Sequence, residues 1–238
     1  MISFHRRLVV CLILLSAVPY LAARVTHVEI ASRADVLDVK PFGETGPYER
    51  ITGRVHFAVP VANIHNRPIV DLVNAVNLQN SEVEFSADFV AFRPKDAAKG
   101  NGTLLLENPN RGHSRILSLV DGGDEDLTHS AGDGWLLRNG FTVVALGWQW
   151  DAVGPNALRL YAPVAKDQGK AITGLLRGDV ILPAKAGEIP LGHMMRAVIG
   201  GSEYPVAQPD DPRNTLTVAS VLPFRGPNGN LPRWSTAS

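Results

Sequence analysis

The residues best suited to chemistry follow two short apolar runs in the middle of the chain. Residues 104–106 lead into a polar, glycine-ended loop at 110–112, and residues 143–146 lead into a tryptophan-rich segment at 147–151. Backbone N–H groups in such a loop can stabilise an oxygen that becomes negatively charged during a reaction. The candidates are Asn110, Arg111 and Gly112 as an oxyanion loop, and Trp148, Trp150 and Asp151 as pocket residues.

Each of these candidates also has a purely structural interpretation. The Arg111 guanidinium can bind a substrate carboxylate through two parallel hydrogen bonds, or it can lie solvated or salt-bridged in a polar turn. Trp148 and Trp150 alternate along a strand end, so one can line a pocket, or both can pack in a core or an interface. Asp151 can be catalytic by its position, or it can cap the end of the strand.

A strand–helix–strand unit is needed to position these residues. The runs 104–106 and 143–146 are continuously apolar, which is typical of strands buried on both faces. Between them, Asp133 is placed to cap a short helix and Gly140 is placed to end it. We therefore expect a parallel pair of strands joined by a helical connection.

Upstream of this unit, alternating side chains predict an antiparallel meander. Residues 25–30, 49–59 and 83–92 alternate between apolar and polar side chains with a period of two. The second of these strands is expected to have one solvated face, which carries Arg50, Thr52, Arg54, His56 and Ala58. Further strands are expected at residues 69–72, 158–162, 172–176, 180–182 and 215–219.

The charge balance and the histidine pattern argue against several classes of function. Basic and acidic residues number 23 each, so no net field favours nucleic acid or an anionic membrane. No two histidines have the His-x-x-x-His spacing of metal ligands, and the acidic run 121–126 lacks the alternating oxygen ligands of a calcium loop. We therefore expect no metal, no cofactor and no nucleic-acid partner.

The first residues of the chain predict export. Arg6 and Arg7 precede an apolar run, residues 8–18, and small residues follow it at 22–23. Such a segment is too short for a membrane-spanning helix, so we predict a signal peptide over residues 1–23 and a periplasmic or extracellular product. Cleavage would remove Cys11, the only cysteine, and would leave no disulfide and no membrane anchor.

Motifs spread over most of the chain carry a resemblance to a known family. The most specific are Gly-Thr-Leu-Leu-Leu-Glu-Asn-Pro-Asn-Arg-Gly at residues 102–112 and Gly-Trp-Gln-Trp-Asp at residues 147–151. Further matching segments lie at residues 46–54, 66–72 and 83–89. Together they resemble the N-terminal part of the bacterial α/β-hydrolase domain family, a group of mostly exported and poorly characterised esterases.

This resemblance implies a fold and an activity for residues 24–238. The implied fold is α/β and β-rich, with antiparallel strands that lead into a mostly parallel sheet, and the implied activity is serine-dependent hydrolysis of small carboxylic esters. The family's Gly-x-Ser-x-Gly elbow, acid and histidine find no counterpart here, because Ser114 and Ser202 lack the flanking glycines. We therefore expect an N-terminal part of the domain, inactive alone.

Two other functions stay open at this stage. The chain can be a β-rich extracytoplasmic binding module without catalysis, or it can work only when a separate chain supplies the nucleophile. If the sheet is incomplete, the runs 104–106 and 143–146 would leave open strand edges, so we expect poor solubility.

Overall fold

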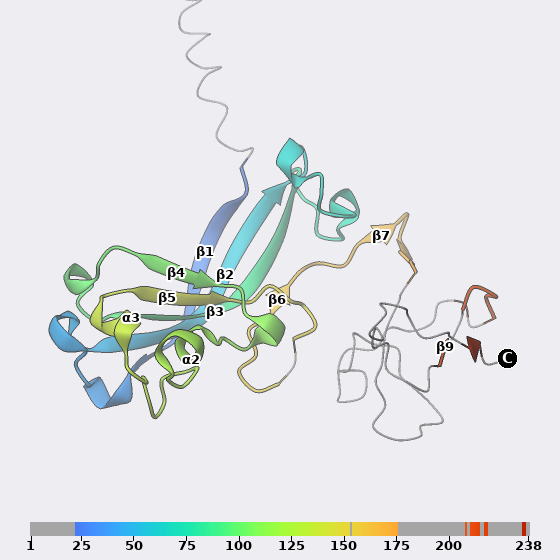
Figure 1. Ribbon diagram of the computed structural model, residues 1–238. Coiled ribbons are helices and arrows are strands. Elements are labelled where there is room, and N and C mark those ends of the chain that lie inside the picture. The colour runs from blue at the N-terminus through green and yellow to red at the C-terminus, as the bar shows by residue number, and fades with distance from the viewer. Residues whose placement is uncertain are drawn as a thin grey trace, which may run out of the picture. The chain divides into compact units, whose positions relative to one another are not determined.

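The computed structural model of the chain describes residues 22–152, 154–175, 208, 210–214, 217–218 and 235–236 (Figure 1). The chain divides into two compact units, Met1–Gly174 and Leu175–Ser238, of which the first holds the candidate residues. Residues 1–21 of the predicted signal peptide lie outside the described residues. Among the residues that the structure does describe, no helix has the length and apolar character needed to cross a membrane.

The first unit is built on a six-stranded mixed sheet with the order β1-β2-β3-β5-β4, in which β6 also pairs with β3. All neighbouring strands are antiparallel except β4 and β5, which run parallel. The strands are β1 (Arg24–Asp35), β2 (Tyr48–Pro60), β3 (Glu82–Pro94), β4 (Leu104–Glu107), β5 (Thr142–Leu146) and β6 (Leu160–Tyr161).

The expectation of a mostly parallel α/β sheet is wrong. The described sheet has one parallel pair of strands. The two α-helices described between β4 and β5 are short, α2 (Ile116–Asp121) and α3 (Trp135–Arg138). The long strands β1, β2 and β3 contribute most of the pairing, since β2 and β3 alone are in register over 13 residue pairs. The parallel pairing extends over only four residue pairs. Antiparallel hairpins therefore set the character of this sheet.

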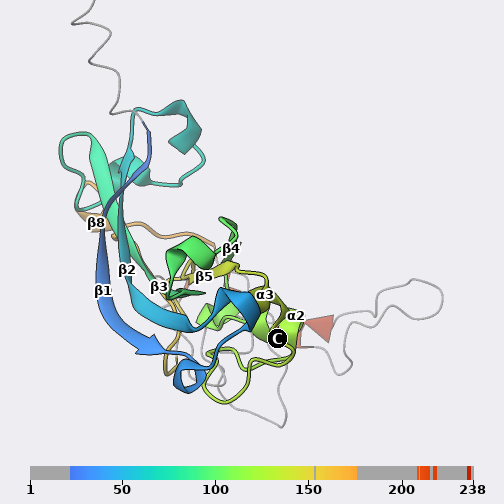
Figure 2. The same cartoon turned by 90° about the vertical axis from the view of Figure 1, so that its left-hand side faces the viewer.

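The predicted meander is confirmed, because the three alternating segments at 25–30, 49–59 and 83–92 lie in β1, β2 and β3. These strands curve along their length, as Figure 2 shows. Two irregularities in the β1–β2 register, between Val25 and His27 and between Ile30 and Ser32, fit this curvature because bulges bend a strand. Gly53 makes room for β1 at this point: a Cβ there would lie 2.0 Å from the carbonyl oxygen of Glu29.

The core lies where the two helices cover one face of β3 and β5. Leu117 of α2 and Leu137 of α3 are fully buried against Phe92 and Val143. The predicted cap of α3 is corrected: the N-cap is Gly134 in a left-handed conformation, and Asp133, one residue earlier, accepts a hydrogen bond from the Trp135 N–H at 2.8 Å. These contacts hold the connection between β4 and β5 against the sheet.

Several local expectations are corrected. Residues 69–72 form no strand; a 3₁₀ turn begins at Leu72 after Asp71 adopts a left-handed conformation. Leu104 and Leu106 are more than half exposed, because β4 is the edge strand of the described sheet and not a central one. The strand expected at 180–182 lies outside the described residues, and residues 172–175 form none.

Shorter elements complete the described chain. The first unit also holds the hairpin strands β7 (Lys166–Asp167) and β8 (Lys170–Ala171), and the second unit holds the paired strands β9 (Thr217–Val218) and β10 (Ser235–Thr236). The 3₁₀ turns are Leu37–Val39, Gly43–Thr45, Ile64–Asn66, Leu72–Asn74, Ala97–Lys99 and Asn110–Gly112.

One carboxylate ties the three long strands together. Glu49 of β2 accepts hydrogen bonds from Arg93 of β3 at 2.6 Å and from Arg33 of β1 at 2.9 Å. Burial alone would raise the pKa of Glu49, but the hydrogen bonds and charges of the two guanidinium groups outweigh it and hold the pKa below its ordinary value. The stabilisation is therefore present above the unfolded-state pKa, about 4.3, and is lost as the pH falls through the lower folded-state value.

The substitution Glu49→Gln tests this link. We expect the free energy of unfolding at pH 7 to fall by about 1 kcal/mol, because two charge-assisted hydrogen bonds weaken. The difference from wild type should shrink as urea unfolding is repeated at pH values below about 4. Glu44→Gln, an exposed site with the same charge change, is the control. A loss that is equal at all pH values would contradict the role assigned to Glu49.

Candidate functional site: a polar cleft on the sheet

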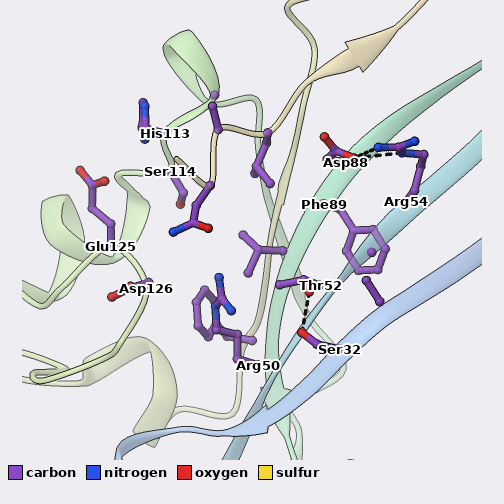
Figure 3. Close-up of a pocket in the computed structure, with 18 of the residues that line it drawn as sticks. Ser32, Arg50, Thr52, Arg54, Asp88, Phe89, His113, Ser114, Glu125 and Asp126 are labelled. Carbon is purple, nitrogen blue, oxygen red and sulfur yellow. Dashed lines mark hydrogen bonds and ion pairs between the residues drawn. The ribbon is translucent and has the colours of Figure 1, made fainter. Parts of the chain in front are cut away.

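A cleft of about 790 Å³ lies between the curved sheet and three loops of the same unit (Figure 3). Its floor comes from β1, β2 and β3, and its walls come from residues 112–114, 125–126 and 155–158. The first of these walls follows β4. The polar side chains that line the cleft are Glu29, Ser32, Arg50, Thr52, Arg54, Asp88, His113, Ser114, Glu125, Asp126 and Asn156.

The register of the sheet decides which side chains meet on the floor. Arg54 of β2 lies opposite Glu29 of β1 and Asp88 of β3. Its guanidinium donates two hydrogen bonds to Asp88 Oδ1, from Nη2 at 2.8 Å and from Nε at 3.0 Å. Asp88 also accepts the Tyr161 hydroxyl at 2.9 Å and the Arg159 N–H at 3.3 Å. This end of the cleft is therefore a closed hydrogen-bond network.

The network shifts the pKa values of its members. The hydrogen bond to Asp88 raises the pKa of Arg54. Burial, followed by the hydrogen bond to Asp88, raises the pKa of the Tyr161 hydroxyl. Both groups therefore keep their protons at neutral pH and act as hydrogen-bond donors to a charged carboxylate.

Arg50 shares this face with Arg54 but meets different neighbours. It lies opposite Ala34 of β1 and Phe92 of β3, neither of which can accept a hydrogen bond through its side chain. Its Nε is sealed from solvent and has no hydrogen-bond partner. Figure 3 places the Arg50 side chain beside Asp126, and no interaction line reaches it. Arg50 is thus a guanidinium on the cleft floor with unused donors.

The loop wall contains a serine and a histidine, but they do not form a catalytic pair. Ser114 Oγ donates to Glu107 Oε2 at 2.6 Å, and the same carboxylate accepts the N–H groups of Arg115 and Ile116. Glu107 therefore anchors the start of α2. His113 lines the cleft from the neighbouring position. Within the described part of the chain, no hydrogen bond joins a serine hydroxyl to a histidine.

The structure brings the predicted loop and the predicted pocket residues together, as one fastened cluster. Arg111 Nη1 donates to Asp151 Oδ2 at 2.8 Å, and both side chains are nearly buried, with 13% and 10% exposed. The Arg111 N–H donates to the Gln149 side chain, and Trp148 Nε1 donates to the Pro109 carbonyl at 2.9 Å. These bonds fix the loop to the end of β5.

This cluster does not present an oxyanion hole. The N–H groups of Arg111 and Gly112 point to the Gln149 side chain and to the Pro109 carbonyl, respectively. Trp148 and Trp150 are about half exposed, and Asn110 is exposed. Of the six candidate residues, Gly112 alone lines the cleft, where a Cβ would lie 2.8 Å from the Leu158 carbonyl oxygen.

Sequence analysis found the strand face that makes the cleft floor but assigned it to solvent. The alternation in β2 correctly groups Arg50, Thr52 and Arg54. The missed signal is a pair of arginines four residues apart on one face of β2, of which Arg54 faces a carboxylate of β3, Asp88, and Arg50 faces Phe92. Glu125 and Asp126 belong to the acidic run 121–126 and are exposed, and their position over the sheet depends on contacts far apart in sequence.

No cluster of three or more histidine, cysteine, aspartate or glutamate side chains suited to a metal occurs in the described part of the chain. Comparisons with protein families, with characterised proteins and with solved structures find no match to this chain.

The structural interpretation of Asp151 can be tested by unfolding. We expect Asp151→Ala to lower the free energy of unfolding by about 3 kcal/mol, because it removes the carboxylate that is paired with the nearly buried Arg111 charge. Asp35→Ala removes the exposed partner of Lys95 and should cost less than about 1 kcal/mol. Urea unfolding of both variants checks the comparison. Equal losses would show that the Arg111–Asp151 pair does not hold the loop.

Proposed function

We propose that this chain binds a small polar molecule in the cleft and does not hydrolyse esters by itself. The observation that carries the proposal is the cleft floor, where Arg50 offers guanidinium donors that the described protein leaves unused. Ligand sites are typically concave, of roughly 300–1,000 Å³, with a few polar groups that fix orientation. The cleft has this size, and its lining is richer in polar side chains than is typical, which suits a polar ligand.

The contacts around Ser114 support binding without catalysis. A nucleophilic serine needs a base that removes its proton and an oxyanion hole beside it. The Ser114 hydroxyl is held by Glu107, whose carboxylate also accepts backbone N–H groups and anchors a helix. The nearby loop amides of Arg111 and Gly112 are paired within the protein. The carboxylate beside Ser114 is thus already engaged with backbone N–H groups, and the loop amides of Arg111 and Gly112 are not available to an oxyanion.

A second candidate function is a contribution to an ester hydrolase whose nucleophile lies outside the described residues. It rests on the resemblance of residues 102–112 and 147–151 to the exported esterases. The position of loop 110–112, after the end of β4, also favours it, since ligands in sheets of parallel strands bind beyond the carboxyl ends of the strands. In this case the loop must rearrange before its amides can face an oxyanion.

The first test is for binding. We expect at least one compound of a broad panel of small polar metabolites to raise the melting temperature of the full chain, because a ligand that binds only the folded state stabilises it. The substitution Ala157→Trp should abolish the shift by filling the cleft, whereas Ala98→Trp, at an exposed turn outside it, should not. A panel without any hit, or a hit that survives Ala157→Trp, would count against the proposal.

The second test is for catalysis. We expect the full chain to show no turnover of p-nitrophenyl acetate above buffer and no labelling by a fluorophosphonate probe, because Glu107, which holds the Ser114 hydroxyl, also binds backbone N–H groups, and the amides of Arg111 and Gly112 are paired within the protein. Ser114→Ala is the matched control. Covalent labelling that disappears in Ser114→Ala would contradict the proposal and would identify Ser114 as a nucleophile.

A further inference from the structure

We propose that the ligand of the cleft is a small zwitterion of the amino-acid or short-peptide type, with its carboxylate on Arg50 and its ammonium group at Glu125 and Asp126. This inference deepens the proposed function and rests on it. It specifies the chemical class that the cleft would select among polar molecules.

The sheet itself singles out Arg50 as the carboxylate site. Arg54, four residues along the same strand, is hydrogen-bonded to Asp88 through two nitrogens of its guanidinium, and Arg33 and Arg93 share Glu49. Arg50 lies between Ala34 and Phe92 in the sheet, so no neighbouring strand supplies it with a carboxylate. A planar guanidinium matches a carboxylate with two parallel hydrogen bonds, and a ligand carboxylate would supply the missing acceptors.

The charges around Arg50 favour a zwitterion over a simple anion. The cleft is lined by the carboxylates of Glu29, Asp88, Glu125 and Asp126 against the guanidinium groups of Arg50 and Arg54. Asp88 and Arg54 compensate each other, so Arg50 faces a surplus of negative charge. A carboxylate alone would be repelled by this surplus, whereas a ligand that also carries an ammonium group would be attracted to it.

Asp126 lies close enough to Arg50 for the two to interact through space. The hydrogen bond from Thr128 lowers the pKa of Asp126, and the Arg50 charge lowers it further against the opposing effect of burial. No ion pair within 4.0 Å joins these two described residues. The space between them can therefore receive a ligand that carries one charge of each sign.

The structural alternative is that Arg50 and Asp126 simply attract each other across the cleft and bind nothing. The two interpretations differ in the effect of Asp126→Asn. If the residues only attract each other, Asp126→Asn and Arg50→Gln should weaken folding alike and reveal no ligand. If a zwitterion binds, Asp126→Asn should weaken its binding and strengthen that of a matched carboxylate without the ammonium group.

The experiment uses the full chain and two sets of probes, the twenty standard amino acids and a series of alanyl dipeptides, each tested singly for a rise in melting temperature. The best probe is then titrated by calorimetry beside its des-amino analogue and its decarboxylated analogue. We expect the zwitterion to bind at least about tenfold more tightly than either analogue, because each loses one charged contact. The two probe sets distinguish a free amino acid from a peptide.

Four variants complete the design. Arg50→Gln should lower the affinity for the zwitterion by about tenfold or more, and Arg50→Lys should retain part of that affinity. Asp126→Asn should act in opposite directions on the zwitterion and on the des-amino analogue. Arg67→Gln, an exposed arginine outside the cleft, should change neither. The opposite effects of Asp126→Asn keep the test decisive even if Arg50→Gln fails to fold.

The outcomes separate this inference from the proposed function. If other polar compounds bind in the cleft but no amino acid or dipeptide does, the proposal of a zwitterionic ligand is wrong, and the proposal that the cleft is a binding site still holds. If the des-amino analogue binds as tightly as the zwitterion, the proposed contact of the ammonium group with Glu125 and Asp126 is wrong. If no compound binds at all, both proposals fail together.

Discussion

The register of the antiparallel strands β1, β2 and β3 is the constraint on which the rest of the first unit depends. Side chains alternate between the two faces of a strand, so a slip of one residue would exchange the faces of β2. In the observed register, Arg54 meets Asp88 across one interface, and Ser32 meets Thr52 across the other, where their hydroxyls lie 2.6 Å apart. The same register places Arg50 opposite Phe92. The composition of the cleft floor is therefore fixed by strand pairing.

A second set of contacts holds the loops that face this floor. The nearly buried Arg111–Asp151 pair and the Trp148 hydrogen bond to Pro109 fasten the loop after β4 to the end of β5. Glu107 anchors the start of α2 by accepting Ser114 and two backbone N–H groups. Residues with the chemical types of a catalytic site thus serve to position a cleft wall. Glu107, Arg111 and Ser114 therefore lie in one loop region because they hold it in place, and their proximity does not by itself indicate catalysis.

Alternation of side chains was sufficient to predict β1, β2 and β3 and to group Arg50 with Arg54, because burial on one face leaves a period-two pattern. The cap of α3 was placed one residue too early, at Asp133, because Gly134 takes the N-cap position in a left-handed conformation. The parallel character of the sheet was overestimated because an apolar run such as 104–106 reads as a central strand, whereas Leu104 and Leu106 lie exposed at an edge. The cleft could not be predicted, because its walls at 125–126 and 155–158 reach the floor only through tertiary packing.

The free-energy cost of the unpaired Arg50 donor connects the fold with the proposed binding of a ligand. A buried donor without a partner typically costs about 1–3 kcal/mol, and the Arg50 Nε is in this position. The neighbouring strands offer Ala34 and Phe92, so the protein cannot recover this cost through the sheet. Asp126 lies on a loop over the floor, and its carboxylate already accepts a hydrogen bond from the Thr128 N–H. A ligand carboxylate would satisfy Arg50 without disturbing that loop, and an accompanying ammonium group would offset the repulsion from the acidic wall. Arg50 lines the cleft although its Nε is sealed, so the ligand would reach the guanidinium from the cleft side.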